Sequence, residues 1–442
     1  MPTQSSLLLS SLWLFTLAAS APAPHCGAGC ETAARSPTVG KAVYFLTNDA
    51  QNAVVALPIA ADGTLSDGTV TATNGAGSNA IDGTTNKTSA PDALVGQSSL
   101  TIAGNSLFAV NAGSDTLTML TISATNPTHL TTLGQPLPLP GEFPNTVAAS
   151  PKHRLACVGT TGAKAGISCA PFHPSHGFVG AMDALRPFDD TLGQSTPPVG
   201  PTNTVSHAFF SADEGRLITT VKGDPAANKT GFVSVFDVEQ QQQQQQQRRW
   251  WRWWGGRGAR GKRGKSAKLA SCDTRSSPEG TAVLFGAALV PGSEDKVFVT
   301  DAAFGAAVLS VGGGAQSGNR AELLAKQAVD GQMATCWATV SEATGTAFVT
   351  DVGVNRVVEM SVEDASVVGV VDLAAQNGDP GLIDLKAAGD FVYALSPGNG
   401  SSPAAVTVLD VSGGRGKARM IQHFELTGMG VGRNAQGMAV MM

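Results

Sequence analysis

The sequence is poor in charge, in aromatic side chains and in long apolar runs. Only 14% of its 442 residues are charged, 6% are aromatic, and Tyr occurs twice. No long segment keeps the 3.6-residue apolar period of an amphipathic helix, which argues against a helical fold. No apolar run reaches the roughly 20 residues that a membrane-spanning helix needs. We therefore expect an all-β chain without a membrane span.

Several catalytic and metal-binding signatures are also missing. There is no GxSxG run, the turn that carries the nucleophilic serine of many hydrolases. The CxxxC of residues 26–30 has no second CxxC partner, and His173 and His176 have no further spaced ligands. The run GMGVG at 428–432 lacks the strand-and-helix setting of a nucleotide loop. The sequence therefore predicts neither a metal nor a cofactor.

What the sequence does contain is a hairpin-like phrase that recurs seven times. It is clearest at Thr346–Val362, TAFVTDVGVNRVVEMSV, where two extended runs flank an Asp/Gly/Asn corner. The corners of the seven copies lie near Asn48, Asn111, Thr160, Lys222, Asp301, Asp351 and Pro397. A repeat of roughly 40 to 50 residues built from hairpins is typical of propeller blades. We predict one seven-bladed β-propeller over residues 41–442.

The two ends of this repeat are incomplete in complementary ways. Val43 begins directly in a hairpin phrase, with no innermost strand before it. The last stretch, QGMAVMM at 436–442, resembles an innermost strand with no hairpin after it. Pairing that stretch with Val43–Thr47 would remove two exposed sheet edges. We therefore predict a ring closed by the C-terminal strand, which joins the first blade.

The N-terminus has the pattern of a secretory signal peptide. Residues 6–19 are apolar, and small residues of the kind cut by signal peptidase follow at 18–21. We predict a signal peptide at 1–20, a leader at 21–40, and a secreted protein located outside the cell or in the cell wall. Three glycosylation sequons fall in loop-like contexts, at Asn86, Asn228 and Asn399.

The six cysteines fit an oxidising compartment, in which an even number indicates disulfides. Cys157 and Cys169 lie on the two arms of the third hairpin, so we predict that they are bonded to each other. The pairing of the other four stays open at this stage: Cys26, Cys30, Cys272 and Cys336.

Residues 240–268 do not follow the blade pattern. Eight glutamines are followed by a stretch with nine Lys or Arg, four Trp and no acid. This composition is typical of a disordered insert between two strands. Basic residues interleaved with Trp could also bind nucleic acid, and a translated intron would give a similar stretch. We favour the insert and expect no nucleic-acid partner.

Candidate site residues lie in the loops that enter the predicted innermost strands, because such loops converge at one mouth of the channel. The innermost strands are expected at Ala93–Ala103, Asn145–Ser150, Val205–Ser211, Thr281–Ala287, Ala334–Val340 and Leu382–Ala387. The loops carry Asp92, Glu142, Asn203, Arg275, Gln332, Asp379 and Arg433. Carboxylates there could act as acid or base, and arginines could hold a carboxylate ligand. His207 lies in an innermost strand, either packed in the core or facing the channel.

Several longer stretches resemble the secreted fungal carboxymuconate-cyclase-like proteins, relatives of the seven-bladed lactonase propellers. They include PGEFPNTVAAS, PPVGPTNTVSHAFFS, SSPEGTAVLFG, ATCWATVSEATGTAFVTDVGVNR and NGDPGLIDLKAAG. The resemblance covers residues 41–442 without the insert. It implies a seven-bladed propeller, secretion, glycosylation, attachment to the cell surface, and a reaction that closes a muconate to a lactone. The His-containing phrase of the related lactonases has its nearest equivalent in VSHAFFSADEG, around His207.

Two classes of function remain. One is a lactonase or muconate cycloisomerase acting on small carboxylates or lactones, with His207 or Glu142 moving a proton and Arg275 and Arg433 holding a carboxylate. The other is a non-catalytic surface glycoprotein that uses the propeller to bind a cell-wall or surface partner, since propellers host both. Arginines converging with an acid or base at one channel mouth would favour the enzyme, and a channel plugged by apolar side chains the scaffold. We expect a monomer and favour the lactonase.

Overall fold

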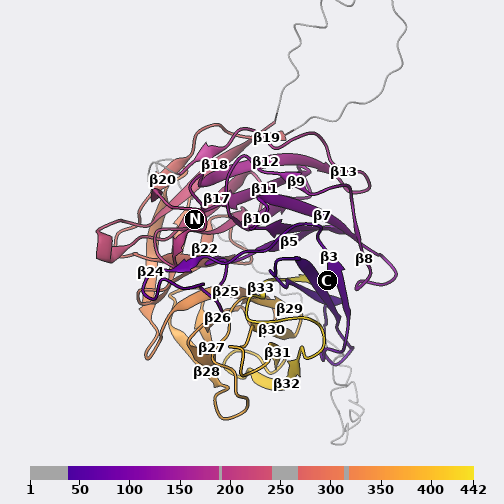
Figure 1. The fold of residues 1–442 in the computed structure, drawn as a ribbon. Coiled ribbons are helices and arrows are strands. Elements are labelled where there is room, and N and C mark those ends of the chain that lie inside the picture. Colours follow the sequence, from indigo (N-terminus) through magenta and orange to yellow (C-terminus); the bar gives the residue numbers. More distant parts are fainter. Residues whose placement is uncertain (1–37, 189–191, 241–266, 313–317) are drawn as a thin grey trace, which may run out of the picture. The chain divides into compact units, whose positions relative to one another are not determined.

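Seven antiparallel sheets make up the chain in the computed structural model, which describes residues 38–188, 192–240, 267–312 and 318–442 (Figure 1). The predicted signal peptide, Cys26, Cys30 and most of the insert lie outside the described residues. Within them, the elements whose bounds are described are strands and one short 3-10 helix, η1 (Pro225–Ala227). No helix of the described residues is long and apolar enough to cross a membrane.

The first four blades, each given from its innermost strand outward, contain the following strands. The first blade contains β33 (Gln436–Met441), β1 (Ala42–Leu46), β2 (Ala53–Pro58) and β3 (Thr69–Ala72), and the second contains β5 (Leu100–Ala103), β6 (Ser106–Asn111), β7 (Thr116–Ile122), β8 (Leu130–Thr132) and β9 (Leu137–Pro138). The third blade contains β10 (Pro144–Ser150), β11 (Leu155–Thr160), β12 (Gly166–His173), β13 (Gly177–Phe178) and β14 (Arg186–Pro187). The fourth blade contains β16 (Val205–Phe210), β17 (Arg216–Val221), β18 (Phe232–Gln240), β19 (Ala267–Leu269) and β20 (Thr274–Ser276).

The last three blades have four strands each. The fifth blade contains β21 (Leu284–Leu289), β22 (Lys296–Asp301), β23 (Gly305–Val311) and β24 (Ala321–Ala328). The sixth contains β25 (Thr335–Ser341), β26 (Thr346–Asp351), β27 (Val354–Ser361) and β28 (Val367–Asp372). The seventh contains β29 (Leu385–Ala388), β30 (Phe391–Ser396), β31 (Ala405–Asp410) and β32 (Arg419–Glu425). A separate parallel pair, β4 (Ile81–Asp82) and β15 (Val199–Gly200), joins two long loops.

The innermost strands contact one another in cyclic order, β33, β5, β10, β16, β21, β25, β29 and back to β33, so the seven sheets form a closed ring. The side chains of each strand reflect its position between the inside and the outside of a blade. The second and third strands of the seventh blade, FVYALS and AVTVLD, are buried throughout, because a neighbouring blade covers each face. Its outermost strand, RMIQHFE, is only partly buried. The predicted seven-bladed propeller is therefore confirmed.

The ring closes as predicted, by pairing β33 with β1. Val440 lies opposite Val43 and Ala439 opposite Tyr44, and the Lys41 amide donates to the Met441 carbonyl at 2.6 Å. The yellow strands of the last blade lie beside the indigo strands of the first (Figure 1). Gly437 has a φ of 75°, and a Cβ there would lie 2.2 Å from the Ser99 hydroxyl, so glycine is required at this bulge.

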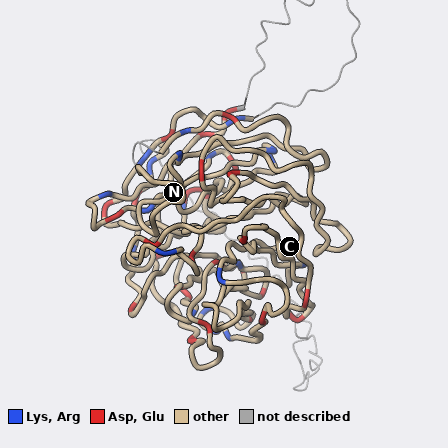
Figure 2. Tube along the Cα trace, viewed as in Figure 1, with Lys and Arg blue, Asp and Glu red and all other residues tan. Residues whose placement is uncertain are grey.

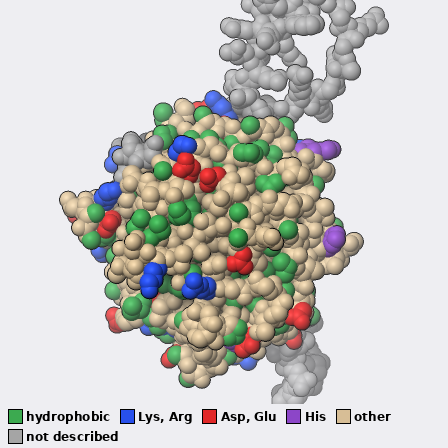
Figure 3. Space-filling model, in the orientation of Figure 1, with side chains coloured by type: hydrophobic (Ala, Val, Ile, Leu, Met, Phe, Trp, Pro, Cys, Tyr) green, Lys and Arg blue, Asp and Glu red, His purple; other side chains and the backbone are tan. Residues whose placement is uncertain are grey.

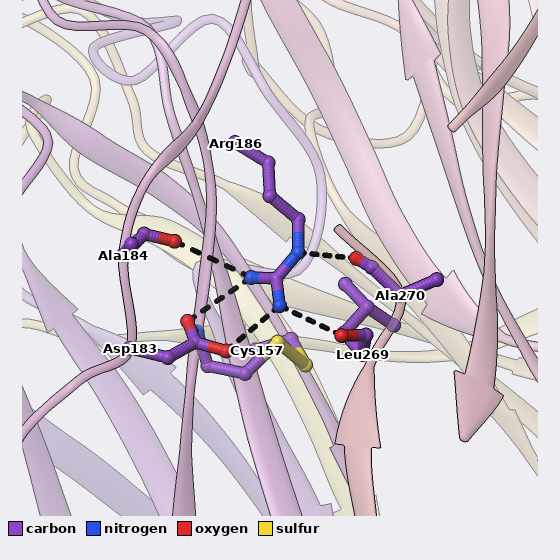
Figure 4. The surroundings of a disulfide bond; sticks show 7 residues. Cys157, Asp183, Ala184, Arg186, Leu269 and Ala270 are labelled. Atoms are coloured by element: carbon purple, nitrogen blue, oxygen red, sulfur yellow. Dashed lines mark hydrogen bonds and ion pairs between the residues drawn. A yellow bond between two sulfur atoms is a disulfide. The ribbon is translucent and has the colours of Figure 1, made fainter. Parts of the chain in front are cut away.

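The predicted disulfide is present. Cys157 on β11 and Cys169 on β12 are direct register partners and are bonded to each other. Beside it, Arg186 donates to both carboxylate oxygens of Asp183 and to the carbonyls of Leu269 and Ala270 (Figure 4). This guanidinium thus links the outer part of the third blade to β19 of the fourth. The other two described cysteines, Cys272 and Cys336, are unpaired.

The insert is narrower than predicted. Gln240 pairs with Ala267 and Glu239 with Lys268, so the residues at its two ends belong to β18 and β19.

Charged residues are sparse along the trace of the propeller (Figure 2). The hydrophobic atoms exposed on the face drawn in Figure 3 form small separate patches. A buried core instead runs through every blade, and it includes Trp337 on β25, which is fully buried.

One segment departs from the predicted pattern. The innermost strand expected at Ala93–Ala103 begins only at Leu100, and residues 93–99, here called the plug, hydrogen-bond the inner parts of four other blades. The Gln97 amide donates to Ser206 of the fourth blade, and its side chain bonds both backbone groups of Ala338 in the sixth. The Ser98 carbonyl accepts from Val147 of the third blade.

The Ser98 amide donates to Asp384, just before the innermost strand of the seventh blade. Val95 and Ser98 have positive φ values of 48° and 62°, which are unfavourable for side chains of these types. The plug keeps this conformation because four other blades hydrogen-bond it in place.

Candidate functional site

A cavity of about 510 Å³ lies at the mouth of the plugged channel. The residues directly before the plug form part of its wall, together with a loop after β15 and the inner ends of the fourth, fifth and sixth blades. Its lining consists of Asp82, Thr85, Thr88, Ser89, Ala90, Pro91, Asp92, Pro201, Thr202, Lys222, Val283, Phe285, Ala302, Ala303, Met333, Ala334, Cys336 and Val352. Its volume suits a small molecule.

The outer wall is held by the parallel pair of β4 and β15. The Ile81 amide donates to Pro198 at 2.9 Å, and the Gly83 amide donates to Gly200 at 2.8 Å. Within this wall the Asp82 carboxylate accepts from the hydroxyl and amide of Thr85, and these bonds lower its pKa. Asp82 is therefore an anion that fixes its own turn.

Lys222 follows β17 at the corner of the fourth blade and is 1% exposed. Its Nζ donates to the carbonyl oxygen of Val95 in the plug and lies 4.1 Å from the centroid of the Phe285 ring. Burial lowers the pKa of this amine, and the negative charge of nearby Asp92 opposes that shift.

Asp92 precedes the plug and is 9% exposed. Its Oδ1 has no hydrogen-bond partner among the described residues, although it is buried. Burial raises the pKa of the carboxyl, against the opposing effect of Lys222 and of the Val95 amide. No ion pair within 4.0 Å joins Asp92 to Lys222 in the described chain.

Cys336 is the fourth titratable group that lines the cavity. Burial, followed by the charge of Asp92, raises the pKa of its thiol well above the usual range. The thiol is therefore protonated and a poor nucleophile. The remaining walls, including Val283, Phe285 and Met333, are apolar. Among the lining residues, Asp92 and Lys222 are the pair able to exchange protons near neutral pH.

Of the residues predicted from the sequence, Asp92 lines this cavity. Asn203 and Gln332 directly follow or precede lining residues, but their side-chain amides bind their own surroundings, the carbonyls of Leu192 and Ala302. They shape the rim without facing the cavity.

The other mouth candidates are placed elsewhere. Glu142 forms a surface ion pair with Lys164 at 2.8 Å, and Asp379 bonds His423 at 3.1 Å. Arg275 lies on β20 at the outer part of the fourth blade, against Asp273, which corrects its expected position before an innermost strand. Arg433 is exposed in the loop before β33. None of these four residues lines the cavity.

His207 is a core histidine that supports the plug. Its Nδ1 accepts from the Ala287 amide at 3.2 Å, so Nε2 carries the proton and donates to the Ser98 hydroxyl at 2.9 Å. Burial, reinforced by Lys386, holds the pKa of His207 well below its usual range. The imidazole is neutral, and it is not among the residues that line the cavity.

Lys222 was missed as a site residue by sequence analysis. The run TTVKGD places it at a corner where the other blades have Asn, Thr, Asp or Pro. A lysine directly after an apolar strand, at such a corner, is the signal that could have identified it.

Comparison by sequence finds no family model and no curated protein that matches this chain. Comparison of structures does find similar folds. A periplasmic gluconolactonase of Pseudomonas aeruginosa has a TM-score of 0.56 and 14% identity, with 90% of this chain and 99% of that chain covered. This similarity supports the propeller fold.

Two further structures show how widely this architecture is shared. A 6-phosphogluconolactonase-like protein of Bacteroides uniformis has a TM-score of 0.50 and 12% identity, covering 71% of this chain and 80% of that chain. A hypothetical selenium-binding protein of Sulfolobus tokodaii has a TM-score of 0.55 and 10% identity, covering 91% and 94%. At these identities the similarity supports the propeller fold alone, and the chemistry must be argued from the cavity.

Proposed function

We propose that the protein is a hydrolase that opens small lactones, with Asp92 as general base and Lys222 as the cation that stabilises the transition state. The observation that carries this proposal is that one carboxyl and one amine, each more than nine-tenths buried, line the same cavity. Burial without an ion pair is unfavourable for both groups, and such an arrangement is typical of active sites.

In the proposed reaction the Asp92 carboxylate takes a proton from a water molecule, whose oxygen attacks the carbonyl carbon of the lactone. The Lys222 ammonium donates a hydrogen bond to the oxygen that becomes negative. The tetrahedral intermediate then breaks the ring C–O bond, and the departing alkoxide takes the proton held by Asp92. The product is a hydroxy acid, whose carboxyl group then releases its proton to the solvent.

The lining residues favour a neutral substrate with apolar substituents. Lys222 is the only cation among them, whereas Asp82 and Asp92 supply two carboxyls, and Val283, Phe285 and Met333 supply apolar contact. A muconate carries at least two carboxylates and would need more cations. Lactone opening therefore fits this cavity better than muconate cyclisation.

We propose that this reaction occurs outside the cell. The Cys157–Cys169 disulfide suits an oxidising compartment. Asn86, Asn228 and Asn399 are all exposed, as glycan acceptors must be. The predicted signal peptide at 1–20 would direct the chain there.

Hydrolysis of neutral five- and six-membered lactones by the purified full-length protein, followed by pH-stat titration, tests the proposal. Asp92→Asn should lower kcat/KM about 100-fold or more, as expected for loss of a general base. Lys222→Met should have a similar effect through loss of transition-state stabilisation. Glu142→Gln, which changes a surface carboxyl outside the cavity, should retain full activity. Equal activity of Asp92→Asn and the unmodified protein would exclude this mechanism.

A further inference from the structure

The amine of Lys222 is held in an unusual way for a buried lysine. Buried lysines are ordinarily paired with a carboxylate, because an unpaired buried charge is strongly unfavourable. Here Nζ has one carbonyl acceptor, on Val95, and one aromatic face, that of Phe285, and no carboxylate lies within 4.0 Å among the described residues. The same amine lines a cavity of about 510 Å³.

We propose that Lys222 is also a nucleophile that forms a Schiff base with small neutral aldehydes and ketones that enter the cavity. This activity goes beyond lactone opening, since it uses the neutral amine where lactone opening uses the ammonium. Both depend on one shared proton, which resides on Lys222 for lactone opening and on Asp92 for attack on a carbonyl.

The step balances without any further reactant. Asp92 takes a proton from the Lys222 ammonium, and the freed lone pair of Nζ forms a bond to the carbonyl carbon. The electrons of the C=O bond move to oxygen, which receives the proton from Asp92 to give a carbinolamine. Asp92 then takes one of the two protons left on nitrogen and passes it to the hydroxyl, which leaves as water while the nitrogen lone pair forms the C=N bond. Ammonium and carbonyl compound become a protonated imine and water, and hydrolysis reverses the process.

The surroundings of the pair support this assignment. Burial of both groups disfavours the ammonium and the carboxylate together, which brings the neutral amine within reach near neutral pH. The bond from Nζ to Val95 fixes the amine, and Oδ1 of Asp92 has no other partner. The neighbouring Cys336 thiol is held protonated and does not compete. The apolar walls select carbonyl compounds without charge.

The chain offers a matched control lysine. Lys326 on β24 also donates to one carbonyl, that of Gly280 at 2.9 Å, and lies 5.2 Å from the centroid of an aromatic ring, Phe304. Lys326 is exposed, whereas Lys222 is buried beside Asp92. A difference in reactivity between the two therefore reports on the cavity rather than on the lysine's local contacts.

The test is reductive trapping of the full-length protein at pH 7 with butanal and sodium cyanoborohydride, followed by peptide mapping by mass spectrometry. At limiting butanal we expect one adduct per chain, on Lys222, formed at least tenfold faster than the adduct on Lys326. Asp92→Asn should slow labelling of Lys222 about 100-fold, the scale of lost acid–base catalysis, and should leave Lys326 unchanged. Cyanoborohydride alone should add no mass.

Labelling of Lys222 no faster than that of Lys326 would overturn the proposal, and this comparison uses the unmodified protein, so it does not depend on a variant that folds. Loss of the preference after unfolding in urea should confirm that the folded cavity causes it. Lactone hydrolysis is measured in parallel on the same preparation. Trapping without lactone turnover would reject only the proposed hydrolase, and turnover without trapping would reject only the Schiff base.

Discussion

Nε2 of His207 donates to the Ser98 hydroxyl at 2.9 Å. The histidine of the phrase VSHAFFSADEG, which resembles the lactonases, therefore holds the plug rather than a substrate. Nδ1 of the same ring accepts from the Ala287 amide of the fifth blade. One imidazole therefore connects the fourth and fifth blades to the segment that positions Asp92 and Val95.

Because of this role, replacement of His207 should lower the stability of the protein but not its lactone turnover. His207→Ala leaves the Ser98 hydroxyl and the Ala287 amide without their partner, at about 1–3 kcal/mol for each buried group left unpaired. Urea unfolding should show the difference, and lactone turnover per folded molecule below the transition should change far less than in Asp92→Asn. A His207→Ala protein as stable as the parent would contradict the structural role.

The same residue predicts a pH dependence of stability. Its folded pKa lies below the unfolded value near 6.5, so the unfolded chain binds a proton first as the pH falls. The contribution of His207 is complete above the unfolded pKa and is lost as the pH falls toward the folded one. The free energy of unfolding between pH 7 and 5 should therefore fall more steeply in the parent than in His207→Gln. Buried Asp384 beside the plug, whose pKa is raised by burial, acts in the opposite sense in both proteins, so it cancels in the comparison.

The activity should show a narrow bell-shaped pH profile. Asp92 acts as a base above its raised pKa, and Lys222 acts as a cation below its lowered pKa, so the two limbs lie closer together than ordinary values of about 3.9 and 10.4. Lys222→Arg keeps the cation and should move the alkaline limb upward in kcat/KM while it abolishes trapping by butanal. An unchanged alkaline limb in this variant would show that ionisation of Lys222 does not cause the loss of activity at high pH.

The disulfide should stabilise the third blade. Cys157 and Cys169 enclose a loop of sequence separation 12, for which cross-linking is worth about 2–3 kcal/mol. Replacing both residues by Ala should lower the midpoint of urea unfolding accordingly. Cys272→Ala, at an exposed and unpaired cysteine, is the control and should have no effect.

Ring closure should be essential for folding. Deletion of residues 434–442 removes β33, the innermost strand of the first blade, and exposes an edge of β1 and a face of its neighbours. We expect an aggregation-prone product with a reduced yield of monomer in size-exclusion chromatography. A truncated chain that melts like the parent would show that the ring does not need this strand.

The insert, in contrast, should be dispensable. Gln240 and Ala267 are register partners, so an Asn-Gly turn can replace residues 241–266 and close the hairpin of β18 and β19. The melting temperature should stay within about 2 °C of the parent, since surface loops contribute little beyond closure entropy. A large fall measured by calorimetry would mean that the deleted residues stabilise the propeller.

The sequence by itself determined the blades, the closure and the disulfide. Each hairpin is a local pattern of apolar runs around a corner, and Cys157 and Cys169 occupy opposite arms of one such hairpin, so neither needed long-range information. Counting strands was enough to assign β33 to the first blade, because one missing and one surplus strand must pair. Periodicity carries this information since it fixes which side of a strand is buried.

Tertiary structure alone decided the site. Residues 93–99 look like a strand in sequence, but the axis of the ring offers them hydrogen-bond partners from four other blades, and these outweigh a strand's own pairing. Asp92 and Lys222 are far apart in the chain, and they line one cavity only because the start of the plug and the corner of the fourth blade lie at the same end of the channel. Arg275 was expected in a loop before an innermost strand because it lies close to the next blade in the sequence. It lies instead in the outer part of the fourth blade, because β20 pairs with β18. Local pattern cannot encode which loops converge at the axis, since that depends on how seven blades close around one another.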